Sequence, residues 1–175
     1  FGFFRELFSL IDFGNNAISK FNEDSVRTFK HGGFAIAGND RFHCILAAVP
    51  IGQKGLGGHN HEDLLQLCVS CDGQPLFVDA GTGNYNYSYE LRTLFRKRQS
   101  HGVPFLTNRS TYLTFSSNSP FDLYDYIMHD ISIRSRFEQS TSIIASRITF
   151  SDYFIERVVQ MQEDVLHIID AFSST

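Results

Sequence analysis

Two histidines stand two positions apart in the stretch "GLGGHNHEDLL", which runs from Gly55 to Leu65. Imidazole nitrogens bind metals and transfer protons near neutral pH, so two of them beside a carboxylate are candidates for chemistry. If the strand that contains Leu65 begins at His59, then His59, His61 and Asp63 project from one face, because alternate residues of a strand share a side. The spacing therefore predicts a polar site at the start of that strand.

Two more side chains are candidates to join this site. Asp79 ends the return strand of a predicted hairpin, and pairing of the two strands would bring it back toward His61. His101 ends a long loop, and closure of that loop would bring it to the same place. Zinc prefers imidazole and carboxylate ligands. The residue types favour a metal site, with a simple turn cap as the alternative role of Asp79.

Two known kinds of metal site contain similar letters. The nuclease motif that is also written HNH takes its residues from separate elements of a ββα unit, whereas residues 59–61 are adjacent. The net charge of -4 also gives no basic footprint for nucleic acid. A cupin carries HxH on an all-β scaffold but then requires a Glu a few residues later, where this chain has Leu65 and Gln66. A nuclease is therefore excluded, and a cupin-like metalloenzyme stays as an alternative.

The elements that must position these residues are short antiparallel strands. Two β runs joined by residues 38–40 are expected between Val26 and Val49. A second hairpin follows around the Asp72-Gly73 turn, with a short return strand from Leu76 to Asp79. Residues 85–101 are expected to form a long loop with a helical turn, and five more runs rich in β-branched and aromatic residues follow. Strands at this density predict an all-β fold, an antiparallel β-sandwich.

Composition limits the class of protein further. The 175 residues are 42% hydrophobic and 19% charged and include 18 Phe, which excludes a disordered chain and indicates one globular domain. No run of about 18 apolar residues is present, so no membrane span is expected. Cys44, Cys68 and Cys71 are too few for a disulfide framework. Because Cys68 and Cys71 would point to opposite faces of a strand, they are expected to pack and not to chelate a metal.

The first residues predict a short helix, since residues 4, 7, 8 and 11 are apolar and have helical spacing. We expect residues 1–22 to form a helical linker and residues 23–175 to form a β-domain that is truncated at its C-terminus. The chain starts with Phe1 and stops directly after a predicted strand, so it is expected to be a fragment of a longer protein.

The stretch "GGHNHEDLLQLCVSCDGQPLFVDAGTGNYNY", followed by an Arg-rich segment and "SHGVP", resembles the C-terminal β-sandwich region of the heparinase II/III-like polysaccharide lyases. In that family a GHxHxD element precedes a strand, a DG turn, a DxGTxxY segment and a later His. The similarity covers roughly Val26 to Val159. It implies a super-sandwich-like β-domain joined to an upstream (α/α)-toroid, which would lie before residue 1 and end in the linker.

The resemblance also implies an activity. Such lyases cleave uronic-acid polysaccharides by β-elimination, in which a base removes the proton at C5 and an acid protonates the leaving O4. The charge that develops on the uronate carboxylate must be stabilised. By this resemblance His59 serves in carboxylate neutralisation or proton transfer, and His61, Asp79 and His101 hold a largely structural zinc. These are the donors that the spacing already suggested.

Further roles follow from the same resemblance. Asp63 is expected to orient a zinc-binding imidazole. Tyr87 and Tyr89 are candidates for proton transfer. An anionic polysaccharide is expected to pass a basic cluster that consists of Arg92, Arg96 and Arg98, whose alternative role is surface solubility.

Two differences from the family set the expected limits of this chain. Gly102 stands where the family has an Asn after the late His, which removes a side chain that could position substrate or zinc ligands. The toroid that supplies other catalytic groups is absent, so the isolated chain is expected to bind metal without turnover. The main alternative is a non-catalytic carbohydrate-binding or structural module of the same fold. Family habit implies a periplasmic or secreted location, and the polysaccharide is left open.

Overall fold

The structure is a computed structural model, and it describes residues 26–49, 59–83, 85, 88–107, 114–115, 123–124 and 130–174. The predicted N-terminal helix and the linker 1–22 lie outside the described residues, and so does Tyr87. Within the described residues, no helix is long and apolar enough to cross a membrane.

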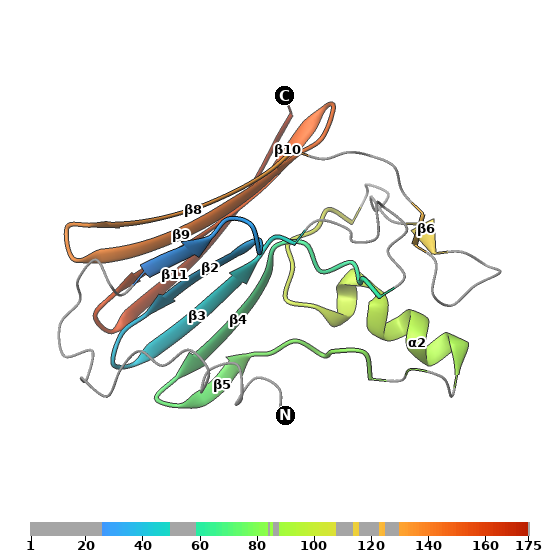
Figure 1. The fold of residues 1–175 in the computed structure, drawn as a ribbon, viewed down its shortest axis with the longest axis horizontal. Helices are drawn as coiled ribbons and strands as arrows, with labels where there is room; N and C mark the ends of the chain where they lie inside the picture. The colour runs from blue at the N-terminus through green and yellow to red at the C-terminus, as the bar shows by residue number, and fades with distance from the viewer. Residues whose placement is uncertain are drawn as a thin grey trace.

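Two antiparallel sheets make up the body of the molecule (Figure 1). The first has five strands in sequence order: β1 (Val26–Phe29), β2 (Phe34–Gly38), β3 (Phe42–Ala47), β4 (Gln66–Cys71) and β5 (Gln74–Phe77). The second has the order β11-β10-β9-β8: β8 (Asp130–Glu138), β9 (Thr141–Thr149), β10 (Tyr153–Gln162) and β11 (Val165–Ser174). The prediction of an all-β antiparallel sandwich is confirmed.

Three smaller elements complete the described fold. A separate two-stranded sheet consists of β6 (Thr114–Phe115) and β7 (Leu123–Tyr124). The helix α2 (Tyr89–Arg96) and the short 3-10 helix η3 (Arg98–Ser100) lie beyond the end of the five-stranded sheet, as Figure 1 shows.

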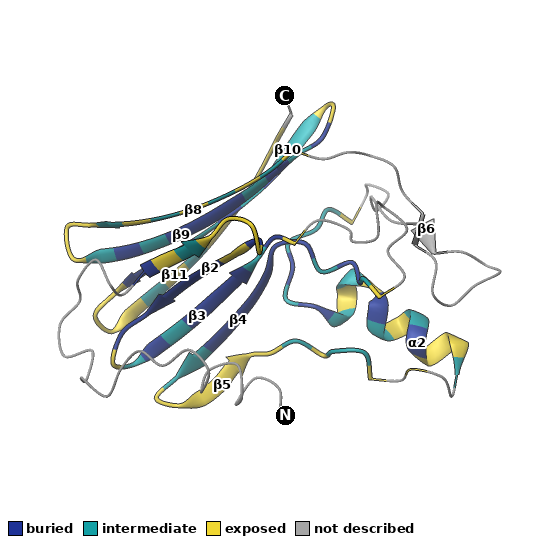
Figure 2. Ribbon diagram, in the orientation of Figure 1, coloured by how far each residue is buried: buried dark blue, intermediate teal, exposed yellow. Residues whose placement is uncertain are grey.

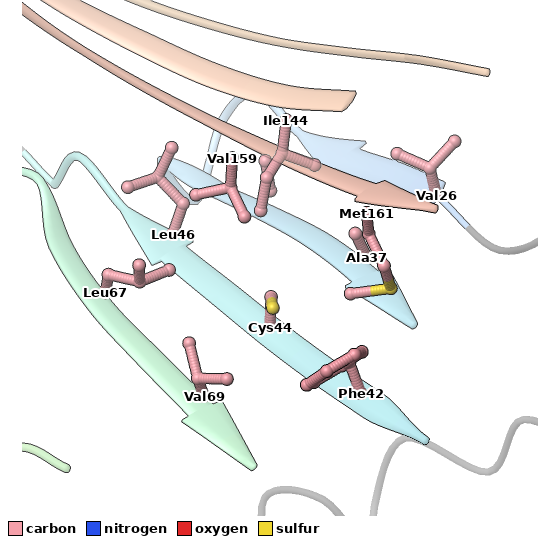
Figure 3. Close-up of a cluster of buried hydrophobic side chains, with 11 residues drawn as sticks. Val26, Ala37, Phe42, Cys44, Leu46, Leu67, Val69, Ile144, Val159 and Met161 are labelled. Carbon is pink, nitrogen blue, oxygen red and sulfur yellow. The ribbon is translucent and has the colours of Figure 1, made fainter. Parts of the chain in front are cut away.

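The alternation of side chains along the strands builds the core. Along β8, half-buried and exposed residues alternate from end to end, as expected of a strand with one face on a core. In Figure 2 buried residues predominate in β3 and β4 of the first sheet and in β9 of the second. The main core, drawn in Figure 3, comprises Val26, Ala35, Ala37, Phe42, Cys44, Leu46, Leu67, Val69, Ile144, Val159 and Met161. All three cysteines are free, and Cys44 packs in this core.

A second apolar cluster lies where β3 ends and β4 begins. It contains Ala48, Leu64 and Leu65 on the side of the first sheet, and Ile148, Phe150 and Ile155 on the side of the second. Leu64 and Leu65 directly follow the segment that carries His59 and His61. This cluster therefore anchors the histidine segment to both sheets.

The first predicted hairpin differs from the structure in one respect. The residues before Gly38 form two strands, β1 and β2, because the chain turns between Lys30 and Gly33. Gly33 has φ +71, and a Cβ there would lie 2.8 Å from the carbonyl oxygen of Ala48. Only glycine fits this turn without strain. The Asp72-Gly73 turn is confirmed, while its return strand is β5, so Asp79 lies two residues after the strand end.

The expected start of the next strand at His59 is wrong. Strand β4 begins at Gln66, and residues 64 and 65 form a turn in which Leu65 has φ +67. A positive φ cannot continue a strand, and the turn is closed by the Gln66 amide, which donates to the carbonyl of Asp63 at 3.0 Å. His59, His61 and Asp63 therefore do not share a strand face.

The segment expected to be a long loop contains a complete helix, α2. Its N-terminus is capped by Ser88, whose hydroxyl accepts a hydrogen bond from the amide of Leu91 at 3.3 Å. The helix buries Arg92 and Arg96, each 2% exposed, and leaves Leu94 53% exposed. This orientation is the reverse of an ordinary amphipathic helix, so the apolar residues of α2 do not mark its buried face.

Candidate functional site

The histidine segment is held along the α2–η3 region by three polar contacts. The amide of Glu62 donates to the carbonyl of Arg96 at 2.8 Å, and Arg96 Nε donates to the carbonyl of Asn60 at 3.0 Å. In turn the amide of Arg98 donates to Glu62 Oε2 at 3.1 Å. The helix therefore replaces the expected strand as the element that fixes the histidines.

Three of the predicted zinc ligands come together in a buried cluster. His101 Nδ1 lies 3.1 Å from Asp79 Oδ2, and the rings of His101 and His61 are tilted with their centroids 5.1 Å apart. The His101 side chain is completely buried, and its Nε2 atom has no hydrogen-bond partner. Asp79 is oriented by the amide of Gly81, which donates to Asp79 Oδ1. The sequence was therefore sufficient to select residues that the fold brings into contact.

Burial sets the charge of His61 and Asp63. Desolvation, together with the positive charges of His101 and Arg96, lowers the pKa of His61 to about 4. Desolvation also raises the pKa of Asp63 to about 6, helped by the negative charge of Asp79 and opposed by His101. His61 is thus neutral at physiological pH, which is the state in which an imidazole binds a metal or accepts a proton.

The pKa values of His101 and Asp79, which are hydrogen-bonded to each other, shift in the directions opposite to those of His61 and Asp63. Burial alone would lower the pKa of His101, but the hydrogen bond and charge of Asp79, with the charge of Asp63, raise it overall. Burial likewise works to raise the pKa of Asp79, and the bonds from His101 and from the Gly81 amide lower it overall. Each partner therefore stabilises the charged form of the other.

The donor set fits zinc in its chemistry. Two imidazoles and a carboxylate are ligands that zinc commonly uses. The buried Nε2 atom of His101 has no hydrogen-bond partner in the protein. Across the part of the chain that the structure describes, no group of three His, Cys, Asp or Glu side chains is arranged as a metal site. The zinc site stays a prediction that rests on donor type and proximity.

His59 has different surroundings from His61. It is exposed, its Nδ1 lies 3.3 Å from the hydroxyl of Tyr85, and the two rings are nearly parallel, with centroids 6.1 Å apart. The Arg92 guanidinium lies over the Tyr85 ring, 4.7 Å from its centroid. Tyr85 was not among the candidates from sequence, although it is the tyrosine of the DxGTxxY segment, and that position is the signal that could have identified it.

The other candidates occupy varied places. Tyr89 is exposed in the first turn of α2. Arg92 and Arg96 are buried against the histidine segment and Tyr85, and Arg98 is half-buried with its guanidinium 4.8 Å from the centroid of the Phe105 ring. The role of these arginines toward a polymeric substrate stays a prediction.

A glutamine that the sequence did not single out lies beside Gly102. Gln66 Oε1 accepts from the amide of Gly102 at 2.7 Å, and its Nε2 donates to the carbonyl of Leu67 at 3.2 Å. A Cβ at position 102 would lie 3.0 Å from that carbonyl oxygen and 3.3 Å from Gln66 Nε2. Any larger residue at position 102 would have to displace this amide.

The comparison with family models gives one match that covers most of the chain. The family described as "Heparinase II/III-like, C-terminal" matches residues 23–172, a range that includes every described candidate residue and both sheets except the last two residues of β11. Among curated proteins and solved structures, no significant match was found. The chain therefore belongs to the heparinase II/III-like family and corresponds to its C-terminal domain.

Proposed function

We propose that this chain is the β-sandwich part of a polysaccharide lyase that cleaves a uronic-acid-containing anionic polysaccharide by β-elimination. Family membership supports a polysaccharide lyase module. The observation that carries the proposal is the contrast between the two histidines of the HxH element. His59 is exposed beside a tyrosine hydroxyl, whereas His61 is buried beside His101.

The exposed pair supplies the groups that β-elimination requires. In this reaction the C5–H bond breaks and its electron pair forms the C4=C5 double bond, while the C4–O4 bond breaks and O4 takes up a proton. An imidazole and a phenol 3.3 Å apart provide a proton acceptor and a proton donor at one place. We assign His59 to this proton transfer or to neutralisation of the uronate carboxylate, with Tyr85 as its neighbour and with Tyr87 and Tyr89 as further candidates.

The basic cluster has a matching role in this proposal. Arg92 carries its charge beneath the His59–Tyr85 pair, and a fixed positive charge near the reacting carboxylate favours its approach and the negative charge that develops on it. Because Arg92 and Arg96 are buried, they would influence a polymer through their electrostatic field and through the groups that they orient. Arg98 is more accessible and is the candidate for direct contact.

His61, Asp79 and His101 would hold the zinc ion in this proposal, and Asp63 would orient one of the imidazoles. A bound zinc would supply positive charge and a cross-link among the histidine segment, the segment after β5 and the end of η3. The neutral state of His61 is the state that such binding requires. We further propose an (α/α)-toroid as the partner domain that supplies the remaining catalytic groups, and a periplasmic or secreted location.

The test uses the protein that contains this chain together with its toroid. Turnover of anionic polysaccharides is followed by the absorbance of the unsaturated uronate product. His59→Ala is expected to lower kcat about 100-fold or more, the range typical of a lost acid–base group. His43→Ala is the matched control, because His43 is half-buried on β3, among the strands of the first sheet.

Two outcomes would contradict the proposal. Products without the double bond would indicate hydrolysis, and full activity in His59→Ala would remove that residue from the reaction. Polysaccharide binding without any cleavage would instead support the alternative of a non-catalytic carbohydrate-binding module.

A further inference from the structure

Arg157 lies in the middle of β10, and its side chain enters the interior of the sandwich, where the residue is only 6% exposed. It pairs with Asp170 of β11 in the sheet register. Its Nε donates to Asp170 Oδ1 at 2.7 Å, and its Nη2 donates to Asp170 Oδ2 at 2.8 Å. This two-point pairing neutralises the guanidinium and fixes the plane of its fork.

The remaining nitrogen of Arg157 connects two segments of the candidate site. Nη1 donates to the carbonyl of Leu65 at 2.9 Å and also to the carbonyl of Gly102. Leu65 ends the turn that follows the histidine segment, and Gly102 directly follows His101. Two carbonyls that share one nitrogen cannot move apart without losing a bond, so one side chain limits the separation of the two segments.

Arg157 is buried, whereas the side chain of Asp170 is 30% exposed on the edge strand β11. The neighbours of Arg157 on the inner face of β10, Ile155 and Val159, are buried apolar residues. An apolar residue at position 157 would pack among them without the cost of desolvating a guanidinium. What an apolar residue would not provide is the two bonds to Leu65 and Gly102.

We propose that Arg157 is a positioning residue that sets the separation of the segments carrying His61 and His101, with Asp170 as the group that aligns its guanidinium. As far as it concerns zinc, this inference rests on the proposed function. The bonds from Arg157 reach backbone carbonyls of both segments, so its effect is transmitted through the backbone.

The experiment measures two properties of the 175-residue chain: zinc affinity by competition titration, and hydrogen exchange of the amides of Leu67 and Gly102. Those amides report on the junction, because Leu67 donates to the carbonyl of Gly102 at 3.2 Å and Gly102 donates to Gln66. Arg157→Lys keeps the charge near Asp170 but loses the planar fork. The double variant Arg157→Met with Asp170→Leu removes both charges and leaves no carboxylate without its partner.

Two controls separate positioning from simple loss of stability. Val159→Ala weakens the core from the same strand and the same face. Arg147→Met removes an ion pair to Glu156, with Nη2 at 3.0 Å from Oε2, from the opposite face of the same sheet. Both controls should leave zinc affinity unchanged and should alter exchange only as much as they alter global stability.

Both Arg157 variants are expected to weaken zinc binding about tenfold, as loss of a supporting contact around a metal site typically does. They should also accelerate exchange of the Leu67 and Gly102 amides beyond the change seen in Val159→Ala. The inference is overturned if both variants match Val159→Ala in both measurements. If the wild-type chain binds no zinc, the zinc proposal fails, and the exchange data alone confirm or overturn the positioning role.

Discussion

At one end of the sandwich the buried amide of Asn39 closes a tight turn, whereas at the other end the buried amide of Gln66 holds a long loop. Asn39 Oδ1 accepts from the amides of Arg41 and Phe42, only two and three residues away, and its Nδ2 donates to the carbonyl of Glu163 at 2.7 Å. The side chain of Asn39 therefore links the turn between β2 and β3 of the first sheet to the turn between β10 and β11 of the second.

The site end also has bonds between residues that are far apart in the sequence. Gln66 is bonded to Gly102, which lies 36 residues away, and Leu65 is bonded to Arg157, which lies 92 residues away. Buried titratable groups are found here, where His61, Asp63 and His101 are all at least partly buried. Both ends therefore contain bonds between distant residues, since Asn39 is bonded to Glu163 across 124 positions, but only the site end combines such bonds with buried titratable groups. Changes in pH or in zinc concentration should therefore affect the site end and not the end that contains Asn39.

Zinc is expected to have the largest effect, and only at the site end. A ligand that binds the folded chain alone stabilises it by about 4 kcal/mol at a free concentration roughly 1,000-fold above its Kd. His61→Ala should abolish this gain, whereas Asn39→Ala should lower stability but keep it. Thermal unfolding with added zinc and with a chelator measures both. A melting temperature that zinc does not change in the wild-type chain would contradict the proposed ligands.

Acid is expected to have the next largest effect. The pKa of His61 falls from an ordinary value of 6.5 to about 4 on folding, because of burial and of the charges of His101 and Arg96. Between these two values the unfolded chain binds more protons than the folded one, so stability falls as the pH falls through this window, by up to about 3 kcal/mol. Protonation of Asp63 works in the opposite direction below about pH 6.

The contribution of His61 can be isolated with a substitution. In zinc-free protein, His61→Gln should lose less stability than the wild-type chain when the pH is lowered from 6.5 to 4, as measured by urea denaturation. Asn39→Ala should keep the wild-type pH dependence, because it lies at the other end. Equal pH dependence in wild type and His61→Gln would show that His61 does not titrate as described.

The two amides offer a matched comparison of moderate size. Gln66→Ala and Asn39→Ala each leave buried amide groups without a partner, so each should cost about 1–3 kcal/mol in unfolding free energy. Only Gln66→Ala should also weaken zinc binding, because Gly102 adjoins His101. Chemical denaturation and zinc titration of both variants provide the measurement. An equal change in zinc affinity would mean that the two ends are coupled.

Two glycines give the smallest expected effect, for different physical reasons. Gly73 has φ +73 and open space around it, so Gly73→Ala should cost about 1 kcal/mol through backbone strain alone. In Gly102→Ala the new Cβ would press on the Leu67 carbonyl and the Gln66 amide, at a cost of about 1–3 kcal/mol. Only the second variant should alter zinc affinity. If Gly102→Ala leaves both stability and affinity intact, the junction is looser than the distances indicate.

Much of the fold was predictable because it depends on local patterns. Alternating apolar residues predict the strands, and Asp72-Gly73 predicts its hairpin, because both are properties of a few adjacent residues. The start of β4 was not predictable. Leu65 adopts a positive φ that its side chain does not favour, and it is supported by Arg157 from the other sheet.

The candidate site, like the fold, was predictable from the sequence only in part. By itself the sequence determined the types of the site residues, and with the family pattern it selected His61, Asp79 and His101, which do lie together. Only the tertiary structure decided that His59 is exposed beside Tyr85 while His61 is buried, and that α2 turns its arginines inward. The physical reason is that burial and bonding depend on the register and stacking of two sheets. Those contacts join residues far apart in the chain, such as Leu65 and Arg157, which are 92 positions apart, and no local pattern encodes them.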